Sequence, residues 1–213
     1  MDKETIKKAI EQLKAQPKKK FVQSYDLIIN LKNIVISQNP VDLFTNIPHP
    51  SGRNVKIAAF VDQQLLAEAE KNCDLVIKES DFSNYSDKKK LKKLAEEYDY
   101  FIAQSSLMTK VASNFGKVLG TKGKMPNPKL GCVVPPNAGL GPLTEKLAST
   151  VRLNAKKAYN LQCMIGKESQ PDNEIVENVL SVYHAVIKHI PDESQNIKNI
   201  SLKLTMSKPV KIS

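Results

Sequence analysis

The stretch Val55-Lys56-Ile57-Ala58-Ala59-Phe60-Val61 decides the fold of this chain. It is a short, mostly apolar run, and such runs are typical of strands that are buried on both faces. Helical spacing follows over residues 63–71, a second apolar run over 75–77, a lysine-rich helix over 87–97 and a third buried run over 98–103. Because strands alternate with helices, the sequence predicts a small parallel α/β layer in the middle of the chain.

The segment after this layer is rich in residues that interrupt regular structure. A helix-like stretch over 107–115 is followed by eleven glycines and prolines between residues 116 and 142. This density predicts a long loop, and so long a loop in a compact domain is usually functional or mobile. We expect a short helix over residues 143–149 to follow this loop and to lead into the C-terminal part of the chain.

Both ends of the chain show half-buried patterns. Residues 3–15 have the spacing of an amphipathic helix, and Tyr25, Leu27, Ile29 and Leu31 alternate with polar residues as in a strand with one solvated face. Further expected elements are a strand over 161–165, a helix over 171–190 and a strand over 197–205. The sequence therefore predicts two domains: a split α+β sandwich formed by both termini, residues 1–56 and 151–213, and an inserted Rossmann-like α/β domain, residues 57–150.

The charge balance favours a polyanionic partner. The chain has 32 lysine and arginine residues against 22 acidic ones, a net charge of +10 and a pI near 9.4. Nucleic acid is the first expectation and an acidic membrane the second, and a lysine-rich solvated surface is the alternative to both. Residues 1–56 and 151–213 carry net charges of +5 and +3 and the middle carries +2, so we expect the RNA surface on the outer domain.

Other classes of protein are disfavoured. No run approaches the roughly 18 apolar residues of a membrane span, and the N-terminus has no secretory pattern. Cys73, Cys132 and Cys163 are too scattered for a disulfide framework or a CxxC metal site. We therefore expect a soluble cytoplasmic protein with no cofactor and no metal.

Enzyme signatures are also missing. HExxH, GxSxG and CxxC do not occur, and the three histidines have no matching Ser/Asp or Cys arrangement. The first strand-to-helix junction of the middle layer, Phe60–Gln64, lacks the glycine that a diphosphate cradle needs. A nucleotide-dependent enzyme that uses the central α/β domain is the alternative function, and this junction argues against it.

Three short motifs could bind RNA. Lys18-Lys19-Lys20-Phe21 can neutralise phosphates and offer a ring to a base, although Phe21 could equally belong to the core. Ile165-Gly166-Lys167 permits close backbone approach, although it could be an ordinary turn. Thr205 and Ser207, in Leu204–Pro209, carry hydroxyl groups that can reach ribose 2′-hydroxyls. The densest charge run, Lys88–Lys93, is more typical of a solvated helix face than of a phosphate contact.

Together these motifs resemble the archaeal and eukaryotic branch of the large-ribosomal-subunit protein one family. The resemblance spans nearly the whole chain, and its glycine/methionine/proline segment is the most specific part. It rests on Phe21-Val22-Gln23-Ser24, on Lys88–Lys93 followed by Leu94–Ala103, on Leu119–Pro128, on Gly166-Lys167 and on Thr205-Met206.

The resemblance implies a non-enzymatic protein of the cytoplasmic ribosome, whose first domain grips ribosomal RNA in the mobile stalk near the tRNA exit site. It further implies assistance to the release of deacylated exit-site tRNA, repression of translation through its own mRNA, no membrane partner, and a monomer outside the ribosome. Contacts in the family match Phe21, Ser24, Gly166, Lys167, Thr205 and Met206. With the neighbouring Lys20 and Ser207, these residues are the candidate RNA-binding set.

Position 207 departs from the family, which usually has glycine after the Thr-Met pair. If the backbone there needs a positive φ, Ser207 would be strained. If glycine serves only to let RNA approach, the serine adds a side chain to the contact. Either alternative predicts a lower RNA affinity than that of a typical member.

Overall fold

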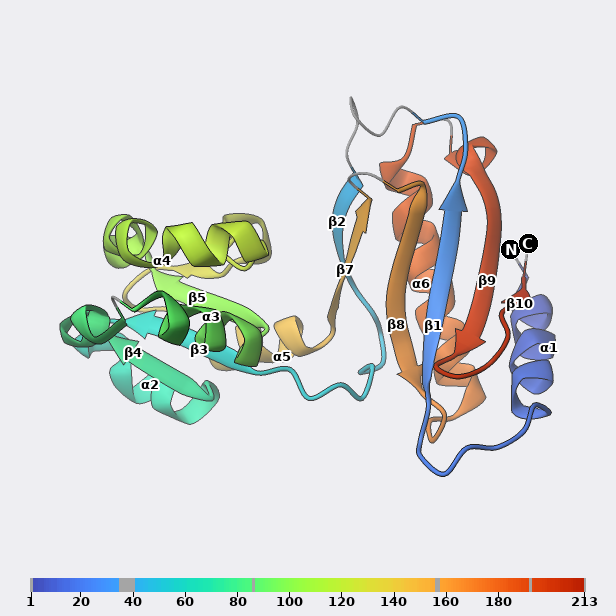
Figure 1. Ribbon diagram of the computed structural model, residues 1–213, viewed down its shortest axis with the longest axis horizontal. Helices are drawn as coiled ribbons and strands as arrows, with labels where there is room; N and C mark the ends of the chain where they lie inside the picture. The colour runs from blue at the N-terminus through green and yellow to red at the C-terminus, as the bar shows by residue number, and fades with distance from the viewer. Residues whose placement is uncertain (1, 35–40, 86, 156–157, 192, 213) are drawn as a thin grey trace. The chain divides into compact units, whose positions relative to one another are not determined.

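The computed structural model describes residues 2–34, 41–85, 87–155, 158–191 and 193–212. The chain divides into two compact units (Figure 1). Unit 1 is Met1–Arg53 with Ser149–Ser213, and unit 2 is Asn54–Ala148. The boundaries expected from the sequence, after residues 56 and 150, lie within three residues of these divisions. Within the described residues, no helix is long and apolar enough to cross a membrane.

Unit 1 is built on an antiparallel sheet with the order β10-β9-β1-β8. Helices α1 and α6 pack on one face of this sheet, where their apolar stripes meet the buried side chains of β1, β8 and β9. The bounds are α1 (Lys3–Lys14), β1 (Ser24–Leu31), β8 (Asn160–Lys167), α6 (Asp172–His189), η5 (Glu193–Asn196), β9 (Ile197–Leu204) and β10 (Val210–Lys211).

Strand β1 shows why the alternating pattern forms this layer. Its residues are buried and half-buried in strict alternation, and Tyr25, Leu27 and Ile29 are wholly inaccessible to solvent. A one-residue slip would turn every one of these side chains away from the helices, so the pattern specifies the register. The predicted helix and strand patterns of the two chain ends are therefore confirmed.

A second, two-stranded antiparallel sheet in unit 1 was not predicted from the sequence. It pairs β2 (Val41–Asn46) with β7 (Thr150–Ala155). Leu43 lies opposite Leu153, and Arg152 makes a bidentate ion pair with Asp42, from Nε and Nη2 at 2.8 Å each. This sheet joins the two chain segments of unit 1 next to the insertion points of unit 2.

Unit 2 contains the predicted parallel sheet, in the order β4-β3-β5-β6. All five residues of β3 are buried, because helices cover both faces of the sheet. Helices α3 and α4 pack on one face, and α2 and α5 lie on the opposite side from α4 (Figure 1). The bounds are β3 (Ile57–Val61), η1 (Gln63–Leu65), α2 (Leu66–Asn72), β4 (Leu75–Lys78), η2 (Glu79–Tyr85), α3 (Lys88–Glu97), β5 (Tyr100–Gln104), η3 (Ser105–Leu107), α4 (Met108–Lys122), η4 (Pro128–Leu130), β6 (Val133–Val134) and α5 (Gly141–Ala148).

Aromatic packing fills the core between this sheet and helices α3 and α4. The Phe60 ring centroid lies 4.7 Å from that of Phe115 and 5.8 Å from that of Phe101. With the antiparallel sheet of unit 1 and this parallel sheet of unit 2, the mixed α+β and α/β fold class predicted from the sequence is confirmed.

The long loop predicted over residues 116–142 is wrong in its first part. Helix α4 continues to Lys122 and ends at Gly123, which has a φ of 65°. Gly116 and Gly120 lie inside the helix, where the buried stripe of Val111, Phe115 and Leu119 passes them. Tertiary packing of that stripe outweighs the low helix propensity of two glycines, each of which costs about 1 kcal/mol relative to alanine.

Candidate nucleic-acid interface

The candidate residues from three distant parts of the sequence meet at one edge of the unit 1 sheet. Because β1 is antiparallel to both neighbours, its first residues lie beside the last residues of β8 and β9 (Figure 1). Ser24 is opposite Lys167, and Tyr25 is opposite both Gly166 and Leu204. We call this edge, with the adjoining residues 18–23, 168 and 205–208, the strand-end platform.

The Thr205 hydroxyl is engaged with the backbone of β1. Its Oγ1 accepts a hydrogen bond from the Ser24 amide at 3.1 Å and lies 3.4 Å from the Ser24 carbonyl oxygen. The Thr205 amide also donates to that carbonyl at 3.1 Å. The side chain thus continues the β-ladder by one residue beyond β9, and its second lone pair remains as an acceptor. The sequence predicted that this hydroxyl can reach a ribose 2′-hydroxyl, and the structure adds that it also bonds to the β1 backbone.

Gln23 connects all three strand ends, and the sequence reasoning missed it. Its side chain is only 3% exposed. Its Oε1 accepts from the Met206 amide at 3.0 Å, and its carbonyl accepts from the Glu168 amide at 2.8 Å. The Gln23 amide points to Glu168 Oε2 at 3.4 Å. A buried glutamine with these partners holds the turn after β9 against the start of β1.

Ser207 is not strained. Asn33, with a φ of 58°, is the one non-glycine residue at positive φ in the described ranges. The Ser207 Oγ accepts from the Leu204 amide at 2.7 Å and lies 3.2 Å from the carbonyl oxygens of Leu204 and Lys208. The hydroxyl therefore closes the turn that carries Thr205 and Met206. Of the two alternatives for this position, the strained backbone is wrong.

Gly166 is required by packing inside the unit. A Cβ at this position would come well within 3.0 Å of the Ile175 side chain and of Gln170 Oε1. Gln170 is held there because its Oε1 accepts from the Lys167 amide at 2.7 Å while its Nε2 donates to the Pro50 carbonyl at 2.7 Å. The glycine thus lets helix α6 and the turn after β8 approach the strand end.

Lys167 is supported from a loop more than a hundred residues away in sequence. A Cβ at Gly52, which has a φ of 72°, would lie 3.1–3.3 Å from the methylenes of the Lys167 side chain. The lysine stem therefore rests on the Gly52 backbone, and glycine is needed there for both its φ and its lack of a side chain. Such support reduces the rotamer entropy that the lysine loses when it contacts a phosphate.

Apolar side chains project from the platform into solvent. Phe21 is 51% exposed, Val22 60% and Met206 64%. Of the two alternatives for Phe21, the exposed ring is therefore the correct one. Exposed rings and thioethers next to lysines are suited to pack against sugars and bases, because sequence-specific recognition of RNA uses stacking on unpaired bases.

The charge of the platform is mainly positive. Lys18, Lys19, Lys20 and Lys208 are exposed and Lys167 is half-buried, and Glu168 adds a carboxylate to the platform. Beneath them lies the Tyr25 ring, where burial first, and then the charges of Asp172 and Glu168, raise the pKa of the phenol to about 12. The platform can therefore offer cations, a carboxylate, hydroxyl groups and apolar surface to an RNA fold.

The remaining candidates lie in unit 2 and have ordinary structural roles. Helix α3 carries Lys88–Lys93 with Leu91 and Leu94 turned into the core, which is the expected solvated face. At the first strand-to-helix junction the Asp62 carboxylate accepts from the Gln63 amide at 2.7 Å, so this amide already has a partner within the chain.

The thiols do not form a reactive site. Burial raises the pKa of Cys73 and Cys132 to about 11 and that of Cys163 to about 12. All three are free and stay protonated at neutral pH, which makes them poor nucleophiles. The described residues hold no group of three or more His, Cys, Asp or Glu side chains that could bind a metal ion.

Comparison with known proteins assigns the family. The family model described as "Ribosomal protein L1p/L10e family" matches residues 13–208. The chain is 37% identical to large ribosomal subunit protein uL1 of Nanoarchaeum equitans over 92% of the chain and 93% of that protein. It is 36% identical to the uL1 proteins of Methanothermococcus thermolithotrophicus and Pyrococcus abyssi, over 100% and 99% of the chain and 99% and 96% of those proteins. The family match covers the strand-end platform, all of unit 2 and most of unit 1, and the chain belongs to the ribosomal protein L1p/L10e family.

Proposed function

We propose that this chain is a non-enzymatic constituent of the large ribosomal subunit and that unit 1 binds ribosomal RNA of the mobile stalk near the tRNA exit site. The observation that carries the proposal is the convergence of Ser24, Lys167 and Thr205, from three strand ends, on one platform. The names of its relatives, which are large-subunit proteins, support the ribosomal part of the proposal.

The chemistry of the platform suits a folded RNA better than a regular duplex. Lysines neutralise phosphates without regard to sequence. The hydroxyl of Thr205 and the nearby backbone groups are short and fixed, so they match 2′-hydroxyls in a wide, shallow minor groove. The exposed side chains of Phe21 and Met206 need unstacked bases, which a stem with an irregular internal loop provides.

The finer roles form part of the same proposal. The stalk-bound protein would assist release of deacylated tRNA from the exit site and, by binding a similar RNA fold in its own mRNA, would repress its own translation. It would work in the cytoplasm on the ribosome and be a monomer outside it. One platform would serve both RNAs, so the two RNAs should compete for the protein.

Filter binding tests the proposal directly. The purified chain is titrated with a stalk-RNA fragment, with a matched regular RNA duplex and with the DNA version of the fragment. Specific recognition predicts that the stalk RNA binds at least about 100-fold more tightly than the other two, because non-specific binding rests on phosphates alone. Equal affinity for all three would refute the proposal.

Variants place the binding surface. Met206→Asp puts a negative charge on a platform side chain that is 64% exposed, so binding should fall while the fold is kept. The matched control is Tyr159→Asp, a residue that is 54% exposed at the opposite end of the sheet, where its carbonyl accepts from the Leu31 amide. If Tyr159→Asp weakens binding as much as Met206→Asp, the platform is not the contact surface.

A further inference from the structure

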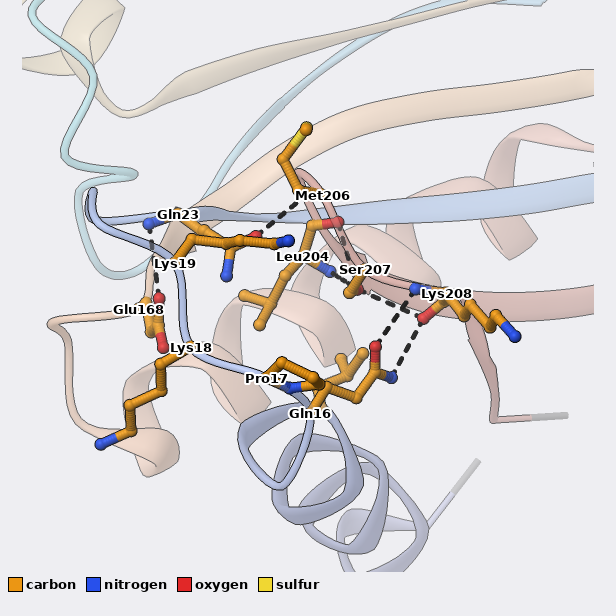
Figure 2. Close-up of a pocket in the computed structure, with 11 residues that line it drawn as sticks. Gln16, Pro17, Lys18, Lys19, Gln23, Glu168, Leu204, Met206, Ser207 and Lys208 are labelled. Atoms are coloured by element: carbon orange, nitrogen blue, oxygen red, sulfur yellow. Dashed lines mark hydrogen bonds between the residues drawn. The ribbon is translucent and has the colours of Figure 1, made fainter.

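A pocket of about 540 Å³ opens on the strand-end platform, whose residues form most of its walls (Figure 2). Its walls come from the end of α1 and the following segment up to Gln23, from Glu168 after β8, and from residues 204–208 after β9. Pockets that hold small organic ligands span about 300–1,000 Å³, so this one has room for a nucleoside. Of the side chains that the proposed function assigns to RNA contact, Met206 lines this pocket, whereas Ser24, Lys167 and Thr205 do not.

The pocket has an apolar floor and a cationic rim. Leu13 and Leu204, which are 0% and 2% exposed, line it together with Pro17. Lys18, Lys19 and Lys208 line it from exposed positions. Such a combination suits a planar aromatic ligand that carries phosphate at one end, because the ring can leave water while the phosphate stays at the mouth.

Two polar side chains that line this pocket, Gln23 and Glu168, have hydrogen-bonding positions that the described residues leave unused. Gln23 is 3% exposed and uses Oε1 to hold the Met206 amide, but within the described part of the chain its Nε2 has no hydrogen-bond partner. Among the same residues, the Glu168 carboxylate accepts only from the main-chain amide of Gln23, at 3.4 Å. Most of the carboxylate lone pairs are therefore unused. Gln16, by contrast, donates from Nε2 to the Lys208 carbonyl and accepts through Oε1 from the Lys208 amide, so both polar groups of its side chain are engaged (Figure 2).

We propose that this pocket binds an unpaired guanine nucleotide that is turned out of the bound RNA. Among the four bases, guanine alone presents two adjacent N–H donors, N1–H and the N2 amino group, and these match the two oxygens of one carboxylate. Glu168 would accept from both, and Gln23 Nε2 would donate to O6. The lysines at the rim would neutralise the flanking phosphates.

The inference rests on the proposed RNA-binding function and makes it more specific. An unpaired base in an internal loop is already partly unstacked, so turning it outward costs little. Among the buried side-chain polar atoms of the described residues only the Tyr25 hydroxyl lacks a hydrogen bond, so Gln23 Nε2 reaches solvent in the free protein and the base would take the place of water there.

A free mononucleotide tests the pocket without the RNA. The full chain is titrated with guanosine, adenosine, cytidine and uridine 5′-monophosphates, and the side-chain amide resonance of Gln23 is followed by NMR. Guanosine monophosphate should shift this resonance and bind about tenfold more tightly than the other three, as a bidentate base contact implies. Equal binding of all four would mean that the lysines capture phosphate alone, and would overturn the inference.

Two near-isosteric variants test the assigned groups. Gln23→Glu keeps an oxygen for the Met206 amide but loses the free donor, and Glu168→Gln keeps an acceptor for the Gln23 amide but loses the charge. Each should weaken guanosine monophosphate binding about tenfold. The matched controls are Gln162→Glu, exposed on β8, and Glu4→Gln, exposed on α1, which should leave binding unchanged. If Gln23→Glu does not fold, Glu168→Gln decides.

An RNA experiment separates this inference from the proposed function. Inosine, which lacks the N2 amino group, replaces each unpaired guanosine of the stalk fragment in turn. One replacement should weaken wild-type binding about tenfold and have no effect on Glu168→Gln. A chain that prefers the stalk RNA but ignores every inosine would overturn the pocket and keep the proposed function. A chain that prefers guanosine monophosphate but binds all RNAs equally would keep the pocket and overturn the proposed function.

Discussion

At the scale of single residues, Gly166 shows how one glycine can serve the interior rather than the ligand. A Cβ at this position would press on Ile175 and Gln170, both of which pack under the platform. We expect Gly166→Ala to lower the free energy of unfolding by about 1–3 kcal/mol, as overpacking does. Urea denaturation measures this, and Gly120→Ala, at a position that faces open space, is the comparison that should not be destabilised. An unchanged midpoint for Gly166→Ala would mean that the neighbours move aside freely.

Tyr25 is the opposite case, because its site accommodates the ring but provides no hydrogen-bond partner for the hydroxyl among the described residues. Its hydroxyl is buried and has no hydrogen-bond partner among the described residues, and the pKa of the phenol is raised to about 12, mainly by burial. Leaving such a group unpaired costs about 1–3 kcal/mol. Tyr25→Phe should therefore raise the free energy of unfolding by about 1 kcal/mol. Urea denaturation at neutral pH checks this, and a lower midpoint would show that the hydroxyl is satisfied by bound water.

The sequence named the residue types of the platform but not their partners. Thr205 and Ser207 could be identified as compact hydroxyl residues in the motif Leu204–Pro209, and Ser24 came from the family resemblance. The bond between Ser24 and Thr205 could not be identified, because it joins positions 181 residues apart. Gln23 was within the matched motif, yet nothing local distinguishes a buried glutamine from an exposed one.

At the scale of elements, helix α4 shows the limit of breaker residues as signals. Gly116 and Gly120 favour a loop by composition, but the buried stripe of α4 runs past both of them. A methyl group added at either position would meet open space, and neither glycine has a positive φ. The helical spacing of the apolar residues therefore predicts α4 better than its glycine content does, because burial of an apolar stripe stabilises a helix more than two glycines destabilise it.

This helix carries its own prediction. Gly120 is exposed, so alanine there adds no clash and removes backbone freedom from the unfolded chain. Gly120→Ala should raise the free energy of unfolding by about 0.5–1 kcal/mol. Thermal unfolding followed by circular dichroism measures the change. The mirror variant Gly123→Ala, at the residue that ends the helix with a φ of 65°, should destabilise the protein instead.

Strands β2 and β7 could not be predicted because their pairing is non-local. Leu43 pairs with Leu153, and the whole inserted unit separates these two residues in sequence. Neither strand alone has a regular alternation of buried residues. Only the pairing with the other strand decides that each segment is extended. Strand β1 was easier, since its own alternation specifies which face is buried.

At the scale of the whole molecule, the insertion gives the chain two separate hydrophobic cores. Each unit has its own cluster of buried side chains, that of unit 1 around Leu27 and Leu202 and that of unit 2 around Phe60 and Phe115. The chain ends and the segments beside the insertion points together build unit 1, so unit 1 cannot close its sheet until residues 160–204 are available. Unit 2 has no such requirement, because it is one continuous segment, Asn54–Ala148.

The charge distribution leads to a prediction about salt. Each lysine that contacts a phosphate releases a bound cation, so the slope of log K against log salt falls by about 1 when such a lysine is removed. Lys20 is exposed on the platform, and Lys167 is supported by Gly52. Lys20→Ala and Lys167→Ala should therefore each reduce the slope for stalk RNA by about 1. Lys88→Ala, on the solvated face of α3, should leave it unchanged. Filter binding over a series of KCl concentrations gives the slopes. If Lys88→Ala reduced the slope as much as Lys167→Ala did, the phosphates would be contacting unit 2, and the platform would have to be abandoned as the RNA surface.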